Sequence, residues 1–180
     1  MNTNTDHRLG VDFGRVIHGA SAPSGVEDTV FLQGGDEQAL RSPPTEGAFD
    51  VLPRLVELFG GRVWIISKCG ERIQRRTLRW LAHQDFYERT GMPPGNVRFC
   101  RKRADKALHC AELGITHMID DRLDVHRALR GLVPYRYLFG HQSQPAPAWV
   151  RAVLTWAEAE TAVTADIAAA LSGPARPRSR

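Results

Sequence analysis

The sequence of 180 residues has few cysteines, no long apolar run and no N-terminal segment of the kind that directs secretion. The three cysteines, Cys69, Cys100 and Cys110, are too few and too widely spaced for a disulfide framework or a zinc site. No apolar run approaches the roughly 20 residues that a membrane helix needs. Residues 1–6 lack the basic and apolar stretches of a secretion signal. We therefore expect an intracellular, cytoplasmic protein in its reduced state, without a membrane anchor.

Little of the net positive charge lies in the body of the chain. The net charge is +4, and an acid-free stretch over residues 174–180 carries three of these charges, so residues 1–173 are almost neutral. We expect 1–173 to form one domain and 174–180 to be a disordered basic tail. This distribution gives little support to a nucleic-acid partner. A local basic cluster is either a solvated loop and helix start or a rim that attracts anions. It consists of Arg98, Arg101, Lys102, Arg103 and Lys106.

Short apolar runs alternate with amphipathic segments along most of the chain. The composition, 42% hydrophobic and 24% charged, is typical of a globular domain. The alternation predicts an α/β protein with a doubly wound parallel sheet and right-handed crossovers, built as a three-layer α/β/α sandwich. The predicted strands cover 8–12, 62–67, 97–100, 115–119 and 135–139, and the predicted helices cover 45–59, 70–83, 104–113, 123–129 and 148–171.

The segment between the first strand and the first helix, residues 14–46, is rich in Gly, Pro and Ser. We expect it to be mostly loop, with Val30–Leu32 as a short strand or hairpin arm, and to act as a flap or minimal cap. On the helix at 70–83, four arginines lie mostly off the apolar face and are typical of a solvated surface. They are Arg72, Arg75, Arg76 and Arg79.

Polar side chains stand at the ends of three predicted strands. Asp12 ends the first, Ser67 ends the second, and the pair Asp120-Asp121 ends the fourth, with Lys106 in the helix before it. In an open α/β sheet, ligands bind at the carboxyl ends of the strands. Carboxylates at such an edge suit Mg²⁺, which prefers one or two of them together with waters and phosphate oxygens.

Each of these residues also has an ordinary structural explanation. A lone Asp after a strand often caps a turn, a Ser before a helix often caps it, and a lysine is usually at the surface. The acidic pair is harder to explain in this way, because adjacent buried acids repel each other unless a cation offsets them. The common location at strand ends therefore favours Mg²⁺-assisted phosphoryl transfer. The chain has no P-loop motif, so we do not expect a P-loop nucleotide hydrolase.

This set resembles the haloacid dehalogenase-like hydrolase superfamily over about residues 8–140. In that family an Asp nucleophile ends the first strand, a Ser or Thr the second and an acidic pair the fourth, and a Lys opens a later helix. The stretches 103–106 and 119–124, together with Glu46-Gly47-Ala48 at a helix start, look most like the 5′(3′)-deoxyribonucleotidase branch. The resemblance implies the three-layer fold, and the short insert after Asp12 leaves room for only a minimal cap.

The resemblance also implies roles for individual residues. Asp12 would be the catalytic nucleophile that forms an aspartyl phosphate, helped by Ser67 and Lys106. Ser67, Lys68 and Lys106 would bind the phosphate of a nucleotide or another small organic phosphate ester. The Mg²⁺ ligands would be Asp12, the Gly14 carbonyl and Asp121, with Asp120 in the outer shell. Which of the two adjacent acids ligates directly stays open here, as does the oligomeric state.

The chain departs from the family pattern at Gly14. The pattern Asp-x-Asp places a general acid two residues after the nucleophile, whereas this chain reads Asp12-Phe13-Gly14. Loss of such an acid typically costs ~10²–10⁴-fold in rate. Three outcomes remain open: turnover of good leaving groups only, a proton from His18 or Arg15 (His18 being preferred), or lost catalysis. A loop histidine is also an ordinary surface residue.

The competing prediction is a non-enzymatic protein that keeps this fold and binds a phosphorylated ligand or a protein partner. The predicted helix at 148–171 would offer it a surface, although such an apolar stripe more often packs inside the molecule. Its candidate buried positions are Val150, Val153, Leu154, Ala157 and Val163.

Overall fold

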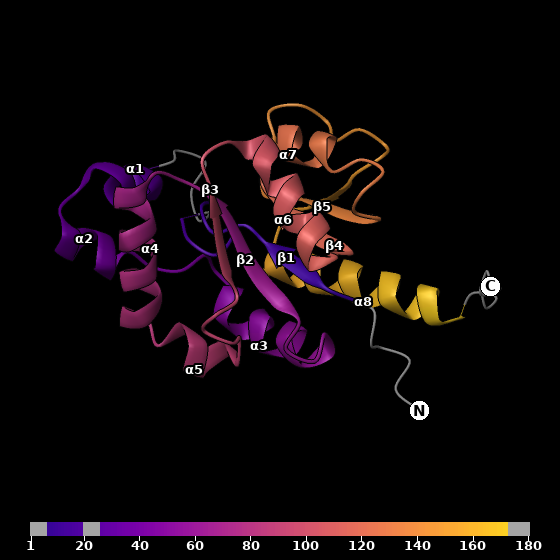
Figure 1. Ribbon diagram of the computed structural model, residues 1–180, viewed down its shortest axis with the longest axis horizontal. Coiled ribbons are helices and arrows are strands. Elements are labelled where there is room, and N and C mark those ends of the chain that lie inside the picture. Colours follow the sequence, from indigo (N-terminus) through magenta and orange to yellow (C-terminus); the bar gives the residue numbers. More distant parts are fainter. Residues whose placement is uncertain (1–6, 20–25, 173–180) are drawn as a thin grey trace.

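The structure, a computed structural model, describes residues 7–19 and 26–172 of the chain (Figure 1). The predicted tail at 174–180 and part of the predicted flap lie outside these residues. The strands are β1 (Leu9–Val11), β2 (Val63–Lys68), β3 (Val97–Cys100), β4 (His117–Asp120), β5 (Tyr135–Phe139) and β6 (Arg151–Val153). The helices are α1 (Val26–Gln33), α2 (Asp36–Arg41), α3 (Ala48–Leu58), α4 (Glu71–His83), α5 (Phe86–Thr90), α6 (Lys106–Leu113), α7 (Leu123–Ala128) and α8 (Trp156–Ser172), with a 3₁₀ turn at Arg103–Asp105.

The six strands form one sheet in the order β3-β2-β1-β4-β5-β6, and every neighbouring pair is parallel. The chain runs outward from β1 to β3, returns to β4 beside β1, and then runs outward again to β6. The order therefore reverses between β1 and β4. In sheets of this kind the crevice at the reversal point is where ligands bind. The predicted doubly wound α/β fold is confirmed.

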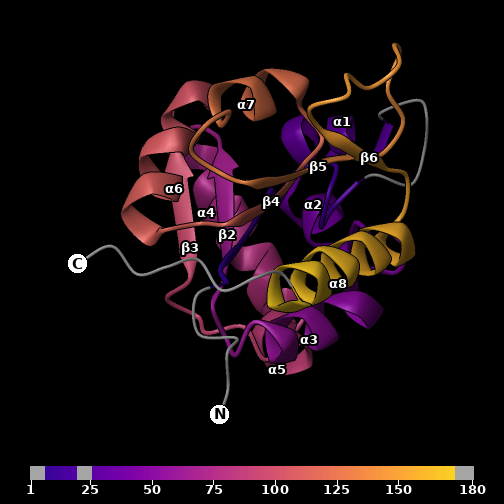
Figure 2. The same cartoon turned by 90° about the vertical axis from the view of Figure 1, so that its right-hand side faces the viewer.

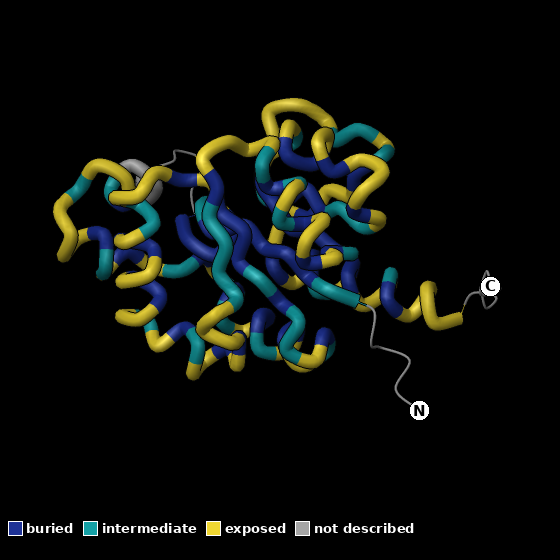
Figure 3. The backbone as a smooth tube through the Cα atoms, in the orientation of Figure 1, coloured by how far each residue is buried: buried dark blue, intermediate teal, exposed yellow. Residues whose placement is uncertain are grey.

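Helices cover both faces of the sheet, which gives the predicted three layers (Figure 2). One buried cluster joins β1 and β2 to residues of α3, α4 and α8, and a second joins Ile66 and Met118 to residues of α6 and α7. The buried segments run through the middle of the molecule and the exposed ones lie outside them (Figure 3). None of the helices in the described part of the chain is long and apolar enough to cross a membrane.

Gly10 allows β1 to lie at the centre of this sheet. A Cβ atom at Gly10 would come within 2.6 Å of the Met118 sulfur and 3.1 Å of Ile66. Both of these are side-chain atoms of the neighbouring strands, so a side chain at position 10 would require Met118 and Ile66 to repack. The Asp12 backbone is held separately, by its N–H donating to the Ile119 carbonyl at 2.9 Å.

Two predicted elements are wrong. Val30–Leu32 belongs to helix α1 rather than to a strand, and the predicted helix at 148–171 is divided into strand β6 and helix α8. Residues 151–153 pair with β5 and extend the sheet by one strand. Helix α8 starts after Thr155, whose Oγ1 accepts a hydrogen bond from the Glu158 N–H at 3.2 Å, an N-terminal cap.

The buried stripe predicted for the C-terminal helix is only partly right. Val150, Val153 and Val163 are buried, but Leu154 is 44% exposed and Ala157 is exposed. The residues of α8 that do pack inside are Trp156, Ala159, Ala162, Val163 and Ile167. The face that was offered as a docking surface is therefore largely part of the core.

Candidate metal centre

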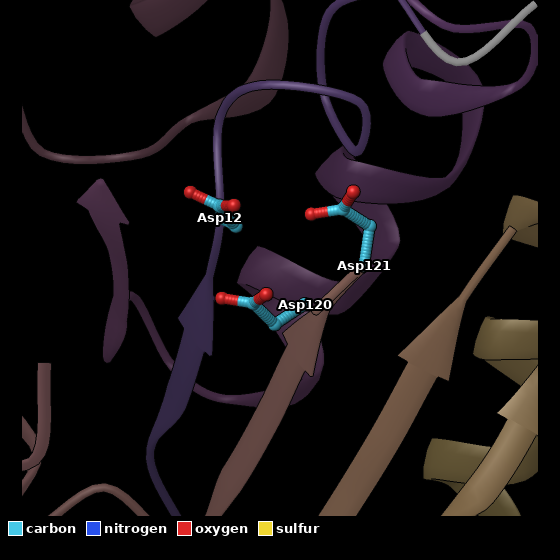
Figure 4. Close-up of side chains that lie close together, drawn as sticks. All are labelled: Asp12, Asp120 and Asp121. Atoms are coloured by element: carbon cyan, nitrogen blue, oxygen red, sulfur yellow. The ribbon is translucent and has the colours of Figure 1, made fainter. Parts of the chain in front are cut away.

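Three carboxylates meet at the point where the strand order reverses (Figure 4). Asp12 follows β1, Asp120 is the last residue of β4, and Asp121 comes next. One oxygen of each carboxylate lies within 4.8 Å of the others, and the three side chains are buried. The predicted convergence is confirmed, and the reason is the direct pairing of β1 with β4, in which Val11 lies opposite Ile119.

Lys106 holds two of these carboxylates together. It is the first residue of α6 and is 1% exposed, with its Nζ 2.9 Å from Asp12 Oδ1 and 2.6 Å from Asp120 Oδ2. Burial alone would lower the pKa of Lys106, but the charges of Asp12 and Asp120 outweigh it and raise this pKa. Both ion pairs favour the charged ammonium form of Lys106, which lies between Asp12 and Asp120.

The site carries more negative charge than Lys106 can offset. Burial is the main reason that the pKa of Asp12 rises to about 6 and that of Asp121 to about 7, and it also raises the pKa of Asp120. Arg15 lies 3.3 Å from Asp121 Oδ2, but its side chain is half exposed and screened by solvent. A buried group of oxygen ligands with excess negative charge could hold a metal ion, and its chemistry suits a hard divalent cation.

The hydrogen bonds divide the carboxylate oxygens into two groups. Asp12 Oδ1 accepts from the Phe13 N–H at 2.8 Å and from Lys106. Both oxygens of Asp120 are occupied, one by Lys106 and one by the Arg122 N–H at 2.8 Å. Among the described residues, Asp12 Oδ2 has no hydrogen-bond donor. Asp12 and Asp121 therefore have the oxygens that remain available to a cation, and Asp120 orients Lys106.

The other predicted residues line one cavity with this cluster. The cavity has a volume of about 400 Å³, and its lining includes Asp12, Asp121, Lys106, Ser67 and Lys68. Gly14 lines the same cavity, and a Cβ atom placed on it would have no atom within 4 Å. The structure thus brings the predicted residues together and leaves open space where the family pattern has its second carboxylate.

His18 is not a surface residue. It is 1% exposed and lies against the rings of Phe13, Phe31 and Trp80. Burial lowers the pKa of His18 to about 4, so the ring is neutral at neutral pH. Its Nε2 is 2.7 Å from the Ser42 hydroxyl. A neutral ring with this nitrogen engaged is poorly suited to replace the missing general acid.

Three of the four α4 arginines, Arg72, Arg75 and Arg79, are exposed as predicted, but Arg76 is not at the surface. Arg76 is 8% exposed and donates to the Phe31 carbonyl at 2.6 Å and to Asp36 at 2.7 Å. Arg72 donates to the Leu32 carbonyl, and Arg79 donates to Asp36. These bonds attach α1 and α2 to α4, so they hold one wall of the cavity. The spacing of three or four residues places these arginines on one side of the helix, which the sequence shows. Their partners lie about 40 residues away, so the sequence did not identify them.

Comparisons with known proteins agree with the fold. No family model matches the sequence, and no curated protein matches it either. Among solved structures, the chain is similar to a haloacid dehalogenase-like family hydrolase from Xanthomonas campestris. That match has a TM-score of 0.62 at 12% identity and covers 94% of this chain and 99% of the other. The chain therefore has the fold of the haloacid dehalogenase-like hydrolases, with a buried group of three aspartates at the ligand-binding edge of its sheet.

Proposed function

We propose that this protein is a Mg²⁺-dependent phosphatase that hydrolyses a small organic phosphate ester, such as a nucleotide, through an aspartyl phosphate on Asp12. The observation that supports this most is the arrangement of the Asp12 carboxylate. Its Oδ1 is fixed by the Phe13 N–H and by Lys106, while Oδ2 has no donor among the described residues. One oxygen is therefore positioned by the protein and the other is available beside the cavity.

The surrounding residues have complementary roles in this proposal. Ser67 donates a hydrogen bond to a phosphate oxygen, and Lys106 and Lys68 offset negative charge on the phosphate. Asp12, Asp121 and the Gly14 carbonyl would hold Mg²⁺, with Asp120 behind them orienting Lys106. The bound cation supplies further neutralisation of the phosphate charge.

The reaction has two steps. A carboxylate oxygen of Asp12 attacks phosphorus, the new O–P bond forms, and the ester P–O bond breaks with its electron pair on the leaving oxygen. A water molecule then attacks the same phosphorus and breaks the bond to Asp12, which releases inorganic phosphate and a proton. Because position 14 has no acid, the leaving oxygen departs without a proton from that position, so a leaving group of low pKa is favoured.

The test is phosphate release from a panel of phosphate monoesters, with Mg²⁺ and with a chelator. We expect Mg²⁺-dependent turnover that Asp12→Asn abolishes. Asp124→Asn is the matched control, because Asp124 is a half-exposed carboxylate that pairs with Arg103 and Arg122 and does not line the cavity.

Gly14 supports the alternative function, a non-enzymatic protein that binds a phosphorylated ligand or a protein partner. In that case the panel would give no turnover, while Mg²⁺ and inorganic phosphate would still bind. That combination would contradict the phosphatase proposal and favour the alternative.

A further inference from the structure

Two arginines that line the cavity have no role in the proposed mechanism. Arg103 lies in the 3₁₀ turn before α6, and Arg122 directly follows Asp121. Both therefore belong to loops at the carboxyl edge of the sheet, and the 3₁₀ turn packs against α7, which starts directly after Arg122. The side chains of Arg103 and Arg122 are 44% and 45% exposed, so a ligand in the cavity can reach them.

The guanidinium groups of these two arginines share a single carboxylate. Arg103 Nη1 is 3.7 Å from Asp124 Oδ2, and Arg122 Nε is 3.4 Å from Asp124 Oδ1. The two guanidinium groups therefore lie beside the same side chain, and the three groups together carry one excess positive charge. Asp124 does not line the cavity, whereas both arginines do, so the uncompensated charge is on the cavity side.

Most N–H groups of the two side chains have no protein acceptor among the described residues. At 3.7 Å the contact of Arg103 is too long for a hydrogen bond, and the side chain of Arg122 donates only through Nε, in a long bond of 3.4 Å. A guanidinium group has five N–H donors and typically binds a carboxylate or a phosphate through two parallel hydrogen bonds. Both arginines therefore keep the paired donors that such an oxyanion needs.

The rest of the basic cluster seen in the sequence is engaged elsewhere. Arg98 and Arg101 bind groups that do not line the cavity, and Lys106 is buried in its two ion pairs. Of the five cluster residues, only Arg103 and Lys106 line the cavity. Arg122 joins Arg103 from the loop after β4, so the two arginines are a local feature of the cavity and not part of a general basic surface.

Binding of the phosphate that is removed does not require these arginines. In the proposed mechanism Mg²⁺, Lys106 and Lys68 offset the charge of that phosphate, and Ser67 donates a hydrogen bond to it. A cavity of about 400 Å³ is in the range that holds a small organic ligand and not only a phosphate ion. The part of the ligand that extends beyond its phosphate can therefore meet the two arginines, where a second oxyanion would accept charge-assisted hydrogen bonds.

We propose that Arg103 and Arg122 form a subsite for a second anionic group of the substrate, a carboxylate or a phosphate that a short linker separates from the phosphate that is removed. Their guanidinium groups hold the oxygens of this second group through charge-assisted hydrogen bonds. This inference rests on the proposed phosphatase function and specifies its substrate class, a small phosphate ester with two anionic groups.

Non-hydrolysable phosphonates test the subsite through their binding to the wild-type protein at saturating Mg²⁺, measured by calorimetry. The series is phosphonoacetate, 3-phosphonopropionate and 4-phosphonobutyrate, each beside its carboxamide, which has the same shape but no charge on the second group. At one chain length we expect the carboxylate to bind at least about tenfold more tightly than the carboxamide. The corresponding bisphosphonates show whether the subsite prefers a phosphate, and a gain with either anion supports it.

Single variants assign the gain to the two arginines. Arg103→Gln and Arg122→Gln should each reduce the gain to about threefold or less, and should leave the affinity for inorganic phosphate unchanged. Lys102→Gln is the matched control, because Lys102 is the exposed neighbour of Arg103, carries the same charge and does not line the cavity. We expect Lys102→Gln to keep the full gain. Both arginines are about half exposed, so the variants should unfold at the wild-type temperature.

The same measurements separate failure of the subsite from failure of the phosphatase function. If inorganic phosphate binds but no second anion adds affinity at any chain length, the subsite is wrong and the phosphatase proposal stands. Equal losses for carboxylate and carboxamide in the arginine variants would place the arginines on the first phosphate, and an equal loss of the gain in Lys102→Gln would show only a general attraction of anions; either result overturns the subsite. If neither phosphate nor any phosphonate binds, the phosphatase proposal fails and the subsite fails with it.

Discussion

Removal of the Lys106 ammonium group is the most direct test of the electrostatic argument. Lys106→Met keeps a buried side chain of similar length but removes the charge that lies 2.9 Å from Asp12 and 2.6 Å from Asp120. Breaking a buried ion pair by deleting one partner typically costs about 3–5 kcal/mol, because it leaves an uncompensated buried charge. In a protein of 180 residues this corresponds to a fall in Tm of roughly 10 °C.

The measurement is thermal unfolding at pH 7.5 in the presence of a chelator. Lys68→Met is the matched control, because Lys68 lines the same cavity but is exposed and has no ion pair among the described residues, so we expect a change within about 0.5 kcal/mol. The double variant Lys106→Met/Asp120→Asn should recover part of the loss, since it removes one of the stranded charges. Equal Tm values for wild type and Lys106→Met would refute the reasoning.

Three further predictions concern neighbouring features. A Cβ atom at Gly14 would have no other atom within 4 Å, so Gly14→Asp can place a carboxyl group there. This variant should raise kcat on alkyl phosphates by about 100-fold or more, whereas Gly14→Asn, of equal size, should not. Equal kcat values for the two variants would contradict the role of the missing acid. Thr77→Val should leave the Tm unchanged or raise it, because the Thr77 hydroxyl has no partner among the described residues. Thr90→Val should lower the free energy of unfolding by about 1–2 kcal/mol, because Thr90 Oγ1 donates to the Phe86 carbonyl at 2.8 Å. A clear fall in the Tm of Thr77→Val would show that the Thr77 hydroxyl is hydrogen-bonded. Burial lowers the pKa of His117 from 6.5 to about 3 in the folded protein, so its stabilising contribution is complete above pH 6.5 and is lost as the pH falls below that value. The difference in unfolding free energy between wild type and His117→Phe should therefore change by roughly 1.4 kcal/mol per pH unit between pH 6 and 4, and a flat difference would contradict it.

The sheet and its polar edge were predictable because both depend on local sequence signals. Strands β1, β2 and β4 each contain a short apolar run, and a polar side chain lies at or directly after the end of that run, as Asp12 follows β1. In a doubly wound sheet, any such residue at a carboxyl end faces the same edge. The order of the elements along the chain was therefore enough to bring Asp12, Ser67, Lys106 and the acidic pair together.

The wrongly predicted elements are those whose structure depends on distant partners. Residues 151–153 have helical periodicity with the following segment, but they form β6 because the edge of β5 is available for pairing. Arginine is usually a surface residue, yet Arg76 is buried because its guanidinium group donates hydrogen bonds to the Phe31 carbonyl and to Asp36. His18 is buried in the same region, among rings contributed by α1 and α4. Local periodicity contains no information about any of these partners.

The structure also separates two residues that the sequence could not. Asp120 and Asp121 are adjacent and chemically identical, but Asp120 ends a strand and its two oxygens are bound by Lys106 and the Arg122 N–H. Asp121 follows the strand and lines the cavity, and within residues 7–19 and 26–172 the ion-pair partner of its carboxylate is the half-exposed Arg15. Each oxygen of Asp120 already shares one of its two lone pairs with a fixed donor, so it offers a cation less than an oxygen of Asp121, and Asp121 is the less costly direct ligand. Asp120 acts through Lys106, so Asp120→Asn should weaken phosphate binding more than Mg²⁺ binding, and Asp121→Asn should do the reverse.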